Sequence, residues 1–338
     1  METFEPHPLL RNPHAQTLAS SFWPRRFPRL PRSTPREFEV EPGTRIRGEC
    51  HWQSEPREHP TLVLVHGLEG SSESGYMLGL AERAFTAGWN AVRLNQRNCG
   101  GTESLTPTLY NSGLSGDFRA VLDEFIKRDS LPEIFFAGYS MGGNLVLKMA
   151  GELAGVAPPQ LRGVAAVCPA LELAQCVDAV DLPSNFVYQW HFVNGLKNRM
   201  RRKVHLFPGK FDLGPMARVR TLREFDDVIT ATYCGFRDAS DYYARCSALR
   251  VVGEIRVPTL VVTAQDDPFV PFASFSDPAV AGNSQIRLIA PEHGGHCAFI
   301  SRHGGDNRFW AEARVMEFFS ELQEALLNHK EIGETGRK

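Results

Sequence analysis

The feature that most constrains the fold of this chain is a G-x-S-x-G pattern at residues 138–142, which lies between two apolar segments. Residues 134–137 before it have the length and character of a buried strand, and residues 145–150 after it suit a buried helix. A serine in this pattern carries chemistry where a strand turns sharply into a helix, because the tight turn lifts its hydroxyl off the sheet. We therefore expect Ser140 to be a nucleophile, and a purely structural glycine-rich turn is the alternative.

Strands and helices alternate along much of the remaining chain. A hairpin is expected over residues 37–52, where two alternating stretches flank a Pro-Gly turn. Regular alternation of this kind indicates one mostly parallel sheet with helices on both faces. The expected buried strands are residues 61–65, 91–94, 134–137, 164–168, 259–263 and 286–289, and the expected helices include 76–85, 118–125 and 309–327.

The alternation stops between residues 169 and 257, a stretch that is crowded with aromatic side chains and mostly helical in pattern. Because it is far too long for an ordinary connection, we expect a mainly helical cap, inserted before the strand that carries the acid. The expected organisation is an α/β core, residues 37–168 and 258–330, with a cap at residues 169–257.

Residues 1–36 form a third part, which holds seven prolines and six arginines. Proline disfavours helix interiors, so this strap is expected to run extended over the surface. Phe22, Trp23, Phe27 and Leu30 are the side chains expected to pack it onto the core. The alternative is a basic and aromatic edge that contacts an anionic membrane surface.

Composition argues against several classes of protein. The net charge of −2 gives no reason to expect a nucleic-acid partner. The seven cysteines are scattered and include no C-x-x-C, so free thiols in a reducing cytoplasm are expected rather than disulfides or a zinc site. No apolar run reaches the ~18 residues of a membrane span, and the N-terminus lacks a signal-peptide pattern. We expect a soluble cytoplasmic protein.

A serine nucleophile needs a base, and the base needs a carboxylate that orients it. In a fold of this kind these partners follow the serine in the order acid, then histidine. Asp266 and Asp267 both follow the strand expected at 259–263, at the edge where α/β sheets place their sites. One of them would orient the base, while the other would cap the following turn.

Three histidines follow the acids. His296 is expected to be the general base, because Gly294 and Gly295 before it give it a flexible, exposed approach. His293 is the alternative base. If His293 is not the base, we expect it to be a surface histidine with its hydrogen bonds satisfied. His303 is expected to lie in a solvated loop.

Acyl transfer also requires two backbone N–H groups directed at the developing oxyanion. One is expected from Met141, directly after the serine, and the other from Leu68, in the loop after the strand at 61–65. His66, which begins this loop, is expected to be buried and hydrogen-bonded, and to shape the loop rather than act as a base.

Five segments, spread over nearly the whole chain, resemble the YheT-like family of α/β hydrolases, which are predicted carboxylesterases. They are residues 12–17 (NPHAQT), 66–72 (HGLEGSS), 138–144 (GYSMGGN), 266–269 (DDPF) and 294–299 (GGHCAF). The resemblance implies an α/β-hydrolase fold, a triad of Ser140, Asp267 and His296, and no metal or organic cofactor. It favours Asp267 over Asp266, because the segment that begins at Asp267 is similar to the usual acid loop of the superfamily.

The chain departs from the family pattern at Asn98, where the family usually has glycine. Asparagine tolerates the left-handed conformation that a glycine would adopt, so we expect the turn at 95–101 to be kept.

Five basic residues lie close together inside the cap: Lys197, Arg199, Arg201, Arg202 and Lys203. One interpretation is a solvated helix face whose charges are balanced by Glu224, Asp226 and Asp227. The other is a lid that attracts a lipid phosphate headgroup or a membrane surface, with the cap aromatics lining an acyl pocket.

The function that these patterns favour is a serine hydrolase that cleaves carboxylic esters through an acyl-enzyme, with short- to medium-chain acyl esters or lipid esters as substrates. An acyltransferase on the same scaffold is an alternative, although His303 and Asp306 are three residues apart, rather than the five of an H-x-x-x-x-D motif. A non-catalytic binding protein of this fold is a third hypothesis, which an apparently complete triad disfavours.

Overall fold

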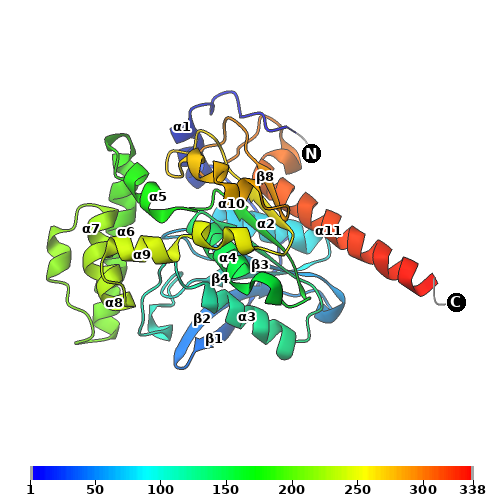
Figure 1. The fold of residues 1–338 in the computed structure, drawn as a ribbon, viewed down its shortest axis with the longest axis horizontal. Helices are drawn as coiled ribbons and strands as arrows, with labels where there is room; N and C mark the ends of the chain where they lie inside the picture. Colours follow the sequence, from blue (N-terminus) through cyan, green and yellow to red (C-terminus); the bar gives the residue numbers. More distant parts are fainter. Residues whose placement is uncertain (1–2, 336–338) are drawn as a thin grey trace.

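The computed structural model describes the backbone of residues 3–335, and the side chains of these residues except 306 and 329–335. Its centre is an eight-stranded sheet in the order β1-β2-β4-β3-β5-β6-β7-β8 (Figure 1). The pairs from β4 through β8 are parallel, while β1 and β2 are antiparallel additions at one edge. The strands are β1 (Thr34–Glu41), β2 (Thr44–His51), β3 (Thr61–Val65), β4 (Asn90–Asn95), β5 (Ile134–Tyr139), β6 (Leu161–Val167), β7 (Thr259–Val262) and β8 (Ile286–Ile289).

Helices cover both faces of this sheet, which confirms the predicted α/β architecture. The helices that pack on it are α2 (Gly75–Thr86), α3 (Ser115–Lys127), α4 (Met141–Leu153) and α11 (Trp310–Thr335). Side chains of α2 and α11 share one hydrophobic cluster, and those of α3 and α4 belong to the other. In β3, Leu62 and Leu64 enter the first cluster, while Val63 and Val65 enter the second. A strand buried on both faces has no polar side, and this is why its sequence is a continuous apolar run.

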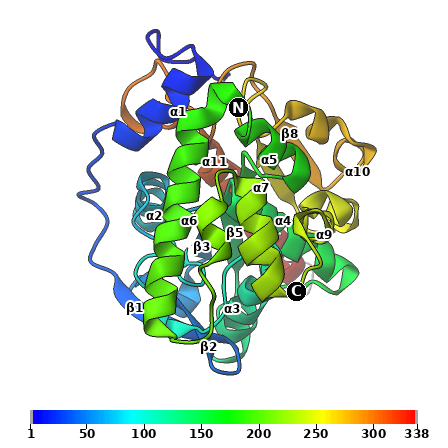
Figure 2. The same cartoon turned by 90° about the vertical axis from the view of Figure 1, so that its left-hand side faces the viewer.

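A group of helices lies between β6 and β7, within the stretch where the sequence predicts a cap (Figure 1). It contains α5 (Leu173–Val180), α6 (Phe186–Leu206), α7 (Leu222–Phe225), a π-helical stretch (Asp226–Ala231), α8 (Thr232–Cys234) and α9 (Ala239–Cys246). The longest, α6, runs along one side of this group, beside α7 (Figure 2). The exact division of the chain into strap, core and cap stays a prediction. One further short helix, α10 (Pro278–Ala281), connects β7 to β8.

The expectation of an extended N-terminal strap is wrong for its central part, which forms α1 (Pro13–Phe22). The Asn12 side chain accepts hydrogen bonds from the backbone N–H groups of His14 and Ala15, and Pro13 occupies the first helical turn. Proline is well tolerated there, since its missing N–H would have no helical partner anyway. Phe22, expected to pack on the core, is 79% exposed.

Other boundaries differ by a few residues from the sequence expectations. The hairpin of β1 and β2 is confirmed, but β1 begins at Thr34, inside the predicted strap. The final helix, α11, continues to Thr335, past the predicted end at residue 327. Among the described residues, no helix combines the length and apolar character needed to cross a bilayer.

Candidate active site

Ser140 lies at a sharp junction between a strand and a helix. β5 ends at Tyr139 and α4 begins at Met141, and the residue between them has a φ of 53°. A Cβ atom at Gly138 would overlap the backbone carbonyl of Gly142, so glycine is needed for the two segments to pass. A positive φ at a non-glycine residue persists only where the surrounding structure fixes it. This is the geometry of a nucleophile elbow.

A continuous chain of hydrogen bonds joins Ser140 to His296 and Asp267. His296 Nε2 lies 2.9 Å from Ser140 Oγ, and its Nδ1 lies 2.8 Å from Asp267 Oδ2. The Asp267 side chain is fully buried. Its other oxygen accepts hydrogen bonds from the N–H groups of Phe269 and Val270, at 2.8 and 3.0 Å. These bonds fix the carboxylate in the orientation that the imidazole requires.

Asp266 and His293, the alternatives for acid and base, form a separate pair. His293 Nδ1 lies 3.2 Å from Asp266 Oδ2, and the His293 side chain is nearly half exposed. Asp266 Oδ1 accepts a hydrogen bond from the N–H of Gly295 at 3.0 Å, which anchors the loop before His296. His303 is exposed, and the side chain of Asp306 lies outside the described residues. Asp266 and His293 therefore pair with each other, while Ser140 bonds His296.

The imidazole of His296 has a strongly perturbed affinity for a proton. Burial disfavours its charged form, but the adjacent Asp267 carboxylate and the Cys297 side chain outweigh burial and raise the pKa of His296 well above its ordinary value. An imidazolium formed between Ser140 and Asp267 would therefore be stabilised. Such stabilisation favours transfer of the serine proton to the ring.

Helix α1 holds the histidine loop in place. The N–H of His296 donates to Thr17 Oγ1 at 2.9 Å. One residue earlier on α1, the buried Gln16 amide bonds both the N–H and the carbonyl of Ile300, at 3.1 and 3.3 Å. Sequence reasoning assigned no role to Thr17 or Gln16. Their only signal was their place in the NPHAQT segment, because nothing local predicts contact with residues almost three hundred positions away.

The loop that carries Leu68 lies directly beside the nucleophile. A Cβ atom at Gly67 would come within 3.1 Å of the Ser140 Cβ, so this loop and the elbow pack at van der Waals distance. The N–H of Gly67 donates to the Tyr76 hydroxyl at 3.1 Å, which fixes the start of the loop. Leu68 and Met141 both line the cavity that contains Ser140.

His66 is a buried structural residue, as the sequence predicts. Its Nε2 accepts a hydrogen bond from the N–H of Gln96 at 3.1 Å, and its Nδ1 lies 2.7 Å from the carbonyl oxygen of Gly67. Burial lowers the pKa of His66 to about 4, so the ring is neutral at pH 7 and able both to accept and to donate. Asn98, in the adjoining turn, has a φ of 64°, which confirms the expected left-handed conformation.

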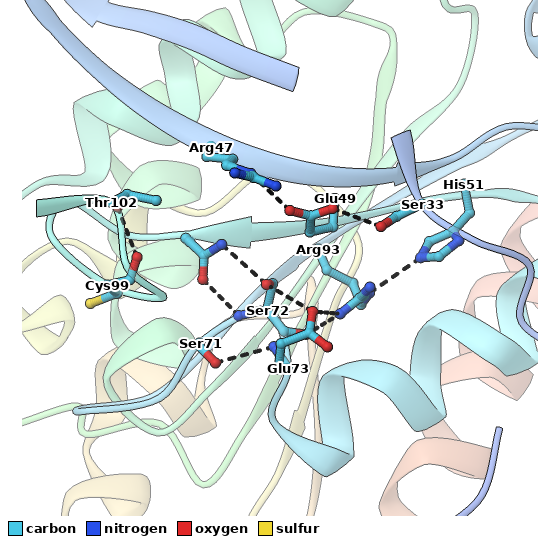
Figure 3. Close-up of polar contacts among 11 residues, drawn as sticks. Ser33, Arg47, Glu49, His51, Ser71, Ser72, Glu73, Arg93, Cys99 and Thr102 are labelled. Carbon is cyan, nitrogen blue, oxygen red and sulfur yellow. Dashed lines mark hydrogen bonds and ion pairs between the residues drawn. The ribbon is translucent and has the colours of Figure 1, made fainter. Parts of the chain in front are cut away.

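The far end of this loop is held by a polar network (Figure 3). Arg93, on β4, donates to the carbonyl of Ser72, to the Glu73 carboxylate at 2.9 Å and to His51 Nε2 at 3.3 Å. The N–H of Ser72 donates to the Asn95 side chain at 2.8 Å. Burial, reinforced by the Arg93 charge, lowers the pKa of His51 to about 4, so the ring accepts from Arg93 as a neutral imidazole. The network fixes the position at which the loop rejoins the core.

An apolar cavity of about 120 Å³ opens onto Ser140 and His296. Core loops form one side of it, and the cap helices form the other. Most of its walls are aliphatic or aromatic, which is typical of ligand sites that take apolar groups. The apolar cap side chains include Leu173, Val177, Val180, Phe192, Leu196, Met200, Leu222 and Phe225.

A buried ion pair connects the cap to the loop beside the nucleophile. Arg199, on α6, lies 3.0 Å from a carboxylate oxygen of Glu69, which directly follows Leu68. The Tyr110 hydroxyl donates to the same carboxylate at 2.6 Å. A Cβ atom at Gly195 would overlap the Glu69 side chain, so glycine allows α6 to approach it. The cap is therefore joined by an ion pair to the loop that carries Leu68.

The predicted solvated face with local charge balance is wrong for much of the basic run in the cap. Arg199 and Lys203 are buried. Arg202 pairs at 2.7 Å with Glu103 of the core rather than with an acid of the cap. The three acids that were expected to balance these charges have other partners. Glu224 and Asp227 accept hydrogen bonds from backbone N–H groups, and Asp226 accepts hydrogen bonds from side-chain hydroxyls.

Three side chains of types that can bind metal ions lie close together at the site. Single ligand atoms of Cys168, His296 and Cys297 all lie within 4.8 Å of one another. Since the His296 nitrogens already contact Ser140 and Asp267, we assign no ion to this group.

Sequence comparisons place these observations among known proteins. Residues 60–302 match the model of the α/β hydrolase fold family. YheT of Escherichia coli (strain K12), which is named as a candidate esterase, is 32% identical over 93% of this chain and 92% of its own. Phospholipase ABHD3 of Mus musculus is 27% identical over 71% of this chain and 58% of its own. Medium-chain fatty acid ethyl ester synthase/esterase 2 of Saccharomyces cerevisiae is 28% identical over 79% of this chain and 63% of its own.

Solved structures share the fold. The esterase Pf2001 of Pyrococcus furiosus is similar with a TM-score of 0.59 and 14% identity, over 95% of this chain and 98% of its own. Est1E of Butyrivibrio proteoclasticus gives a TM-score of 0.55 and 18% identity, over 86% of this chain and all of its own. At these identities the likeness concerns architecture alone.

Proposed function

Since this chain belongs to the YheT-like branch of the α/β hydrolase family and is a carboxylic ester hydrolase, we propose that Ser140, His296 and Asp267 are its catalytic triad. The observation that carries the proposal is the unbroken hydrogen-bond chain from Asp267 through His296 to Ser140, which ends at an apolar cavity. If Ser140 neither contacted a histidine nor faced a cavity, its position at the turn would indicate only a structural role.

The reaction follows from the positions of these atoms. Ser140 Oγ attacks the ester carbonyl while His296 Nε2 takes its proton. Asp267 holds the ring through Nδ1 and stabilises the imidazolium. The imidazolium then gives its proton to the leaving alkoxide, which departs as an alcohol and leaves an acyl-enzyme. Water, deprotonated by the same His296, attacks the acyl-enzyme. The imidazolium returns this proton to Ser140 Oγ as the carboxylic acid is released.

The developing negative charge on the carbonyl oxygen requires donors that are already in place. We assign this role to the backbone N–H groups of Leu68 and Met141. Support comes from the close packing of Gly67 against Ser140, and from the position of Met141 at the start of α4. The positive end of a helix dipole lies there and favours an anion.

The proposed substrates are short- to medium-chain acyl esters, with lipid esters as an extension of the same class. The apolar walls of the cavity support an aliphatic acyl chain rather than a charged group. The names of the relatives agree with this class, since they include a phospholipase and a medium-chain ethyl ester synthase/esterase.

We also propose that the protein contacts an anionic lipid surface through the first turns of α6 and the neighbouring α1. Phe186, Val187 and Trp190 are each at least 60% exposed on one face of α6. His14 of α1 stacks on Tyr188, so the two helices lie side by side (Figure 2). Binding of the protein to phosphatidylserine vesicles, weakened in a Trp190→Ala variant, is the expected result. No vesicle binding at low salt would contradict it. The expected cytoplasmic location stays a prediction.

The test of function is an assay with p-nitrophenyl esters of graded acyl length, comparing wild type with Ser140→Ala. We expect hydrolysis by wild type only, with kcat/KM rising from acetate to a medium chain. Equal hydrolysis by Ser140→Ala would contradict the triad. Activity on acetate alone would exclude the longer substrates, and ester formation from an added alcohol in preference to hydrolysis would favour the acyltransferase alternative.

A further inference from the structure

Two cysteines meet directly behind the histidine of the proposed triad. Cys168 follows β6, and Cys297 follows His296. The N–H of Cys297 donates to Cys168 Sγ at 3.3 Å. The two sulfur atoms and one ring nitrogen of His296 lie within 4.8 Å of one another. The pair therefore brings two thiols together at the point where the catalytic base joins the chain.

Both cysteines also have unusual backbone conformations. The φ angle is 45° at Cys168 and 59° at Cys297. Non-glycine residues are strained in this region, and they concentrate at functional sites. The two residues lie at the end of a central strand and in the histidine loop, respectively.

Cys297 is accessible to small molecules from a side that the substrate does not use. Of the seven cysteines, Cys297 and Cys234 are partly exposed, whereas the other five are buried. Cys297 lines a second cavity, of about 510 Å³, together with Tyr76, Tyr139 and Arg25. This cavity lies between the N-terminal strap and α2, and it does not include Ser140. A small oxidant can therefore approach Cys297 through this cavity while the cavity at Ser140 is occupied.

We propose that Cys168 and Cys297 are an oxidation-sensitive thiol pair, which hydrogen peroxide converts to a disulfide that switches off the hydrolase. The Cys297 thiolate attacks one peroxide oxygen, forms a sulfenic acid and releases hydroxide, which takes up the thiol proton as water. Cys168 then attacks that sulfur, forms the S–S bond and displaces a second water. In total two thiols lose two protons and two electrons, and one peroxide becomes two waters.

The local surroundings favour this chemistry at Cys297. Burial raises the pKa of its thiol, but the neighbouring Cys168 and the imidazole of His296 outweigh burial and lower that pKa to about 6. The thiolate is the reactive form toward peroxide. Burial raises the pKa of Cys168 instead, so Cys168 fits the role of the second, resolving thiol.

Disulfide formation would move the catalytic base. The S–S bond is about 2.05 Å long, much shorter than a contact between two thiols. Cys297 shares a peptide bond with His296, so closing this gap pulls the histidine loop toward β6. A displacement of about 1 Å of a catalytic group costs on the order of a hundredfold in rate. The expected effect is a loss of the ester hydrolysis that the proposed triad carries out, so the proposal rests on the proposed function.

The test combines an ester assay with peptide mapping after a peroxide titration. Wild type, Cys168→Ala, Cys297→Ala and Cys234→Ala are treated, quenched and normalised to their own untreated activity. Cys234 is the matched control, since it is the other partly exposed thiol. We expect wild type and Cys234→Ala to lose activity at least tenfold, to show a Cys168–Cys297 linked peptide, and to recover with dithiothreitol. Cys297→Ala is expected to keep most of its activity.

Three results would overturn the proposal. The first is inactivation of wild type without the linked peptide. The second is equal inactivation of wild type and Cys297→Ala. The third is a fully formed linked peptide in an enzyme that remains active. Peptide mapping does not need turnover, so a protein without esterase activity would refute the proposed triad while the mapping still decides whether the disulfide forms.

Discussion

Asp266 and Asp267 follow the same strand, yet their side chains serve different partners. Asp267 bonds the His296 ring and two backbone N–H groups, whereas Asp266 bonds His293 and the N–H of Gly295. Sequence reasoning from the residues left both acids open, because which side chain faces the base depends on the backbone angles of the turn. Only the resemblance to the acid loop of the superfamily separated them.

The two acids give a sharp comparison by mutation. We expect Asp267→Asn to lower kcat by about 10⁴, since the amide would stabilise the wrong ring tautomer of His296. Asp266→Asn retains an oxygen for the N–H of Gly295 and should cost less than about tenfold. Steady-state kinetics on one ester measures both. A larger loss in Asp266→Asn than in Asp267→Asn would show that the acid was misassigned.

The raised pKa of His296 sets the pH dependence. The base must be neutral to accept the serine proton, so activity is lost as the pH falls through its pKa. Because the pKa of His296 lies above the usual value of about 6.5, the acidic limb of kcat/KM should lie above pH 6.5. A pH–rate profile with an acidic limb near pH 5 would contradict the predicted direction.

At the scale of elements, helix α1 shows where sequence reasoning ends. The core strands and the cap helices follow from apolar runs and periodicity, and they appear as predicted. Helix α1 was missed because the many prolines and arginines of residues 1–36 outweighed a local start signal, the pair Asn12-Pro13, although α1 itself contains one proline and no arginine. Its contacts with the histidine loop join opposite ends of the chain, which no local pattern reports.

The link between α1 and the histidine loop can be tested with a nearly isosteric change. Thr17→Val removes the acceptor for the N–H of His296 but keeps the volume of the side chain. We expect kcat to fall by about tenfold with a smaller change in KM, because a lost hydrogen bond of roughly 1 kcal/mol lets the base drift. Ser20→Ala, one turn further along α1, is the control. Equal effects of the two variants would mean that α1 acts only through stability.

The ion pair between α6 and the loop that carries Leu68 has its own prediction. Glu69→Gln removes the charge that holds Arg199, while Glu103→Gln removes a second link from the cap to the core, to Arg202. Since Glu69 follows Leu68 directly, we expect kcat to fall by about tenfold or more in Glu69→Gln. Glu103→Gln should leave kcat nearly unchanged. A loss confined to KM would place Glu69 in substrate binding instead.

At the scale of the whole molecule, core and cap share one site between them. The core supplies the proposed triad and the proposed oxyanion donors, and the cap supplies most of the apolar wall. The order and type of the core elements could be predicted because parallel strands are long apolar runs. The shape of the cavity could not be predicted, since it depends on how short cap helices pack and on cross-links such as Arg199 to Glu69.

Cavity shape makes a prediction about acyl length. Val180→Phe places a larger side chain in the cap wall, whereas Val187→Phe changes an exposed position on α6. We expect Val180→Phe to lower kcat/KM for a medium-chain ester by about tenfold relative to acetate. Val187→Phe should leave this ratio unchanged. An unaltered ratio in Val180→Phe would mean that the acyl chain occupies another path.

The most direct test of the proposed triad is labelling with a fluorophosphonate probe, followed by peptide mapping of the modified residue. Such a probe reacts with a serine that its own active site activates. We expect wild type to be labelled at Ser140 and His296→Ala to lose the label, with folding of both proteins checked by circular dichroism. A folded wild type that takes no label, or takes it at another serine, would refute Ser140 as the nucleophile.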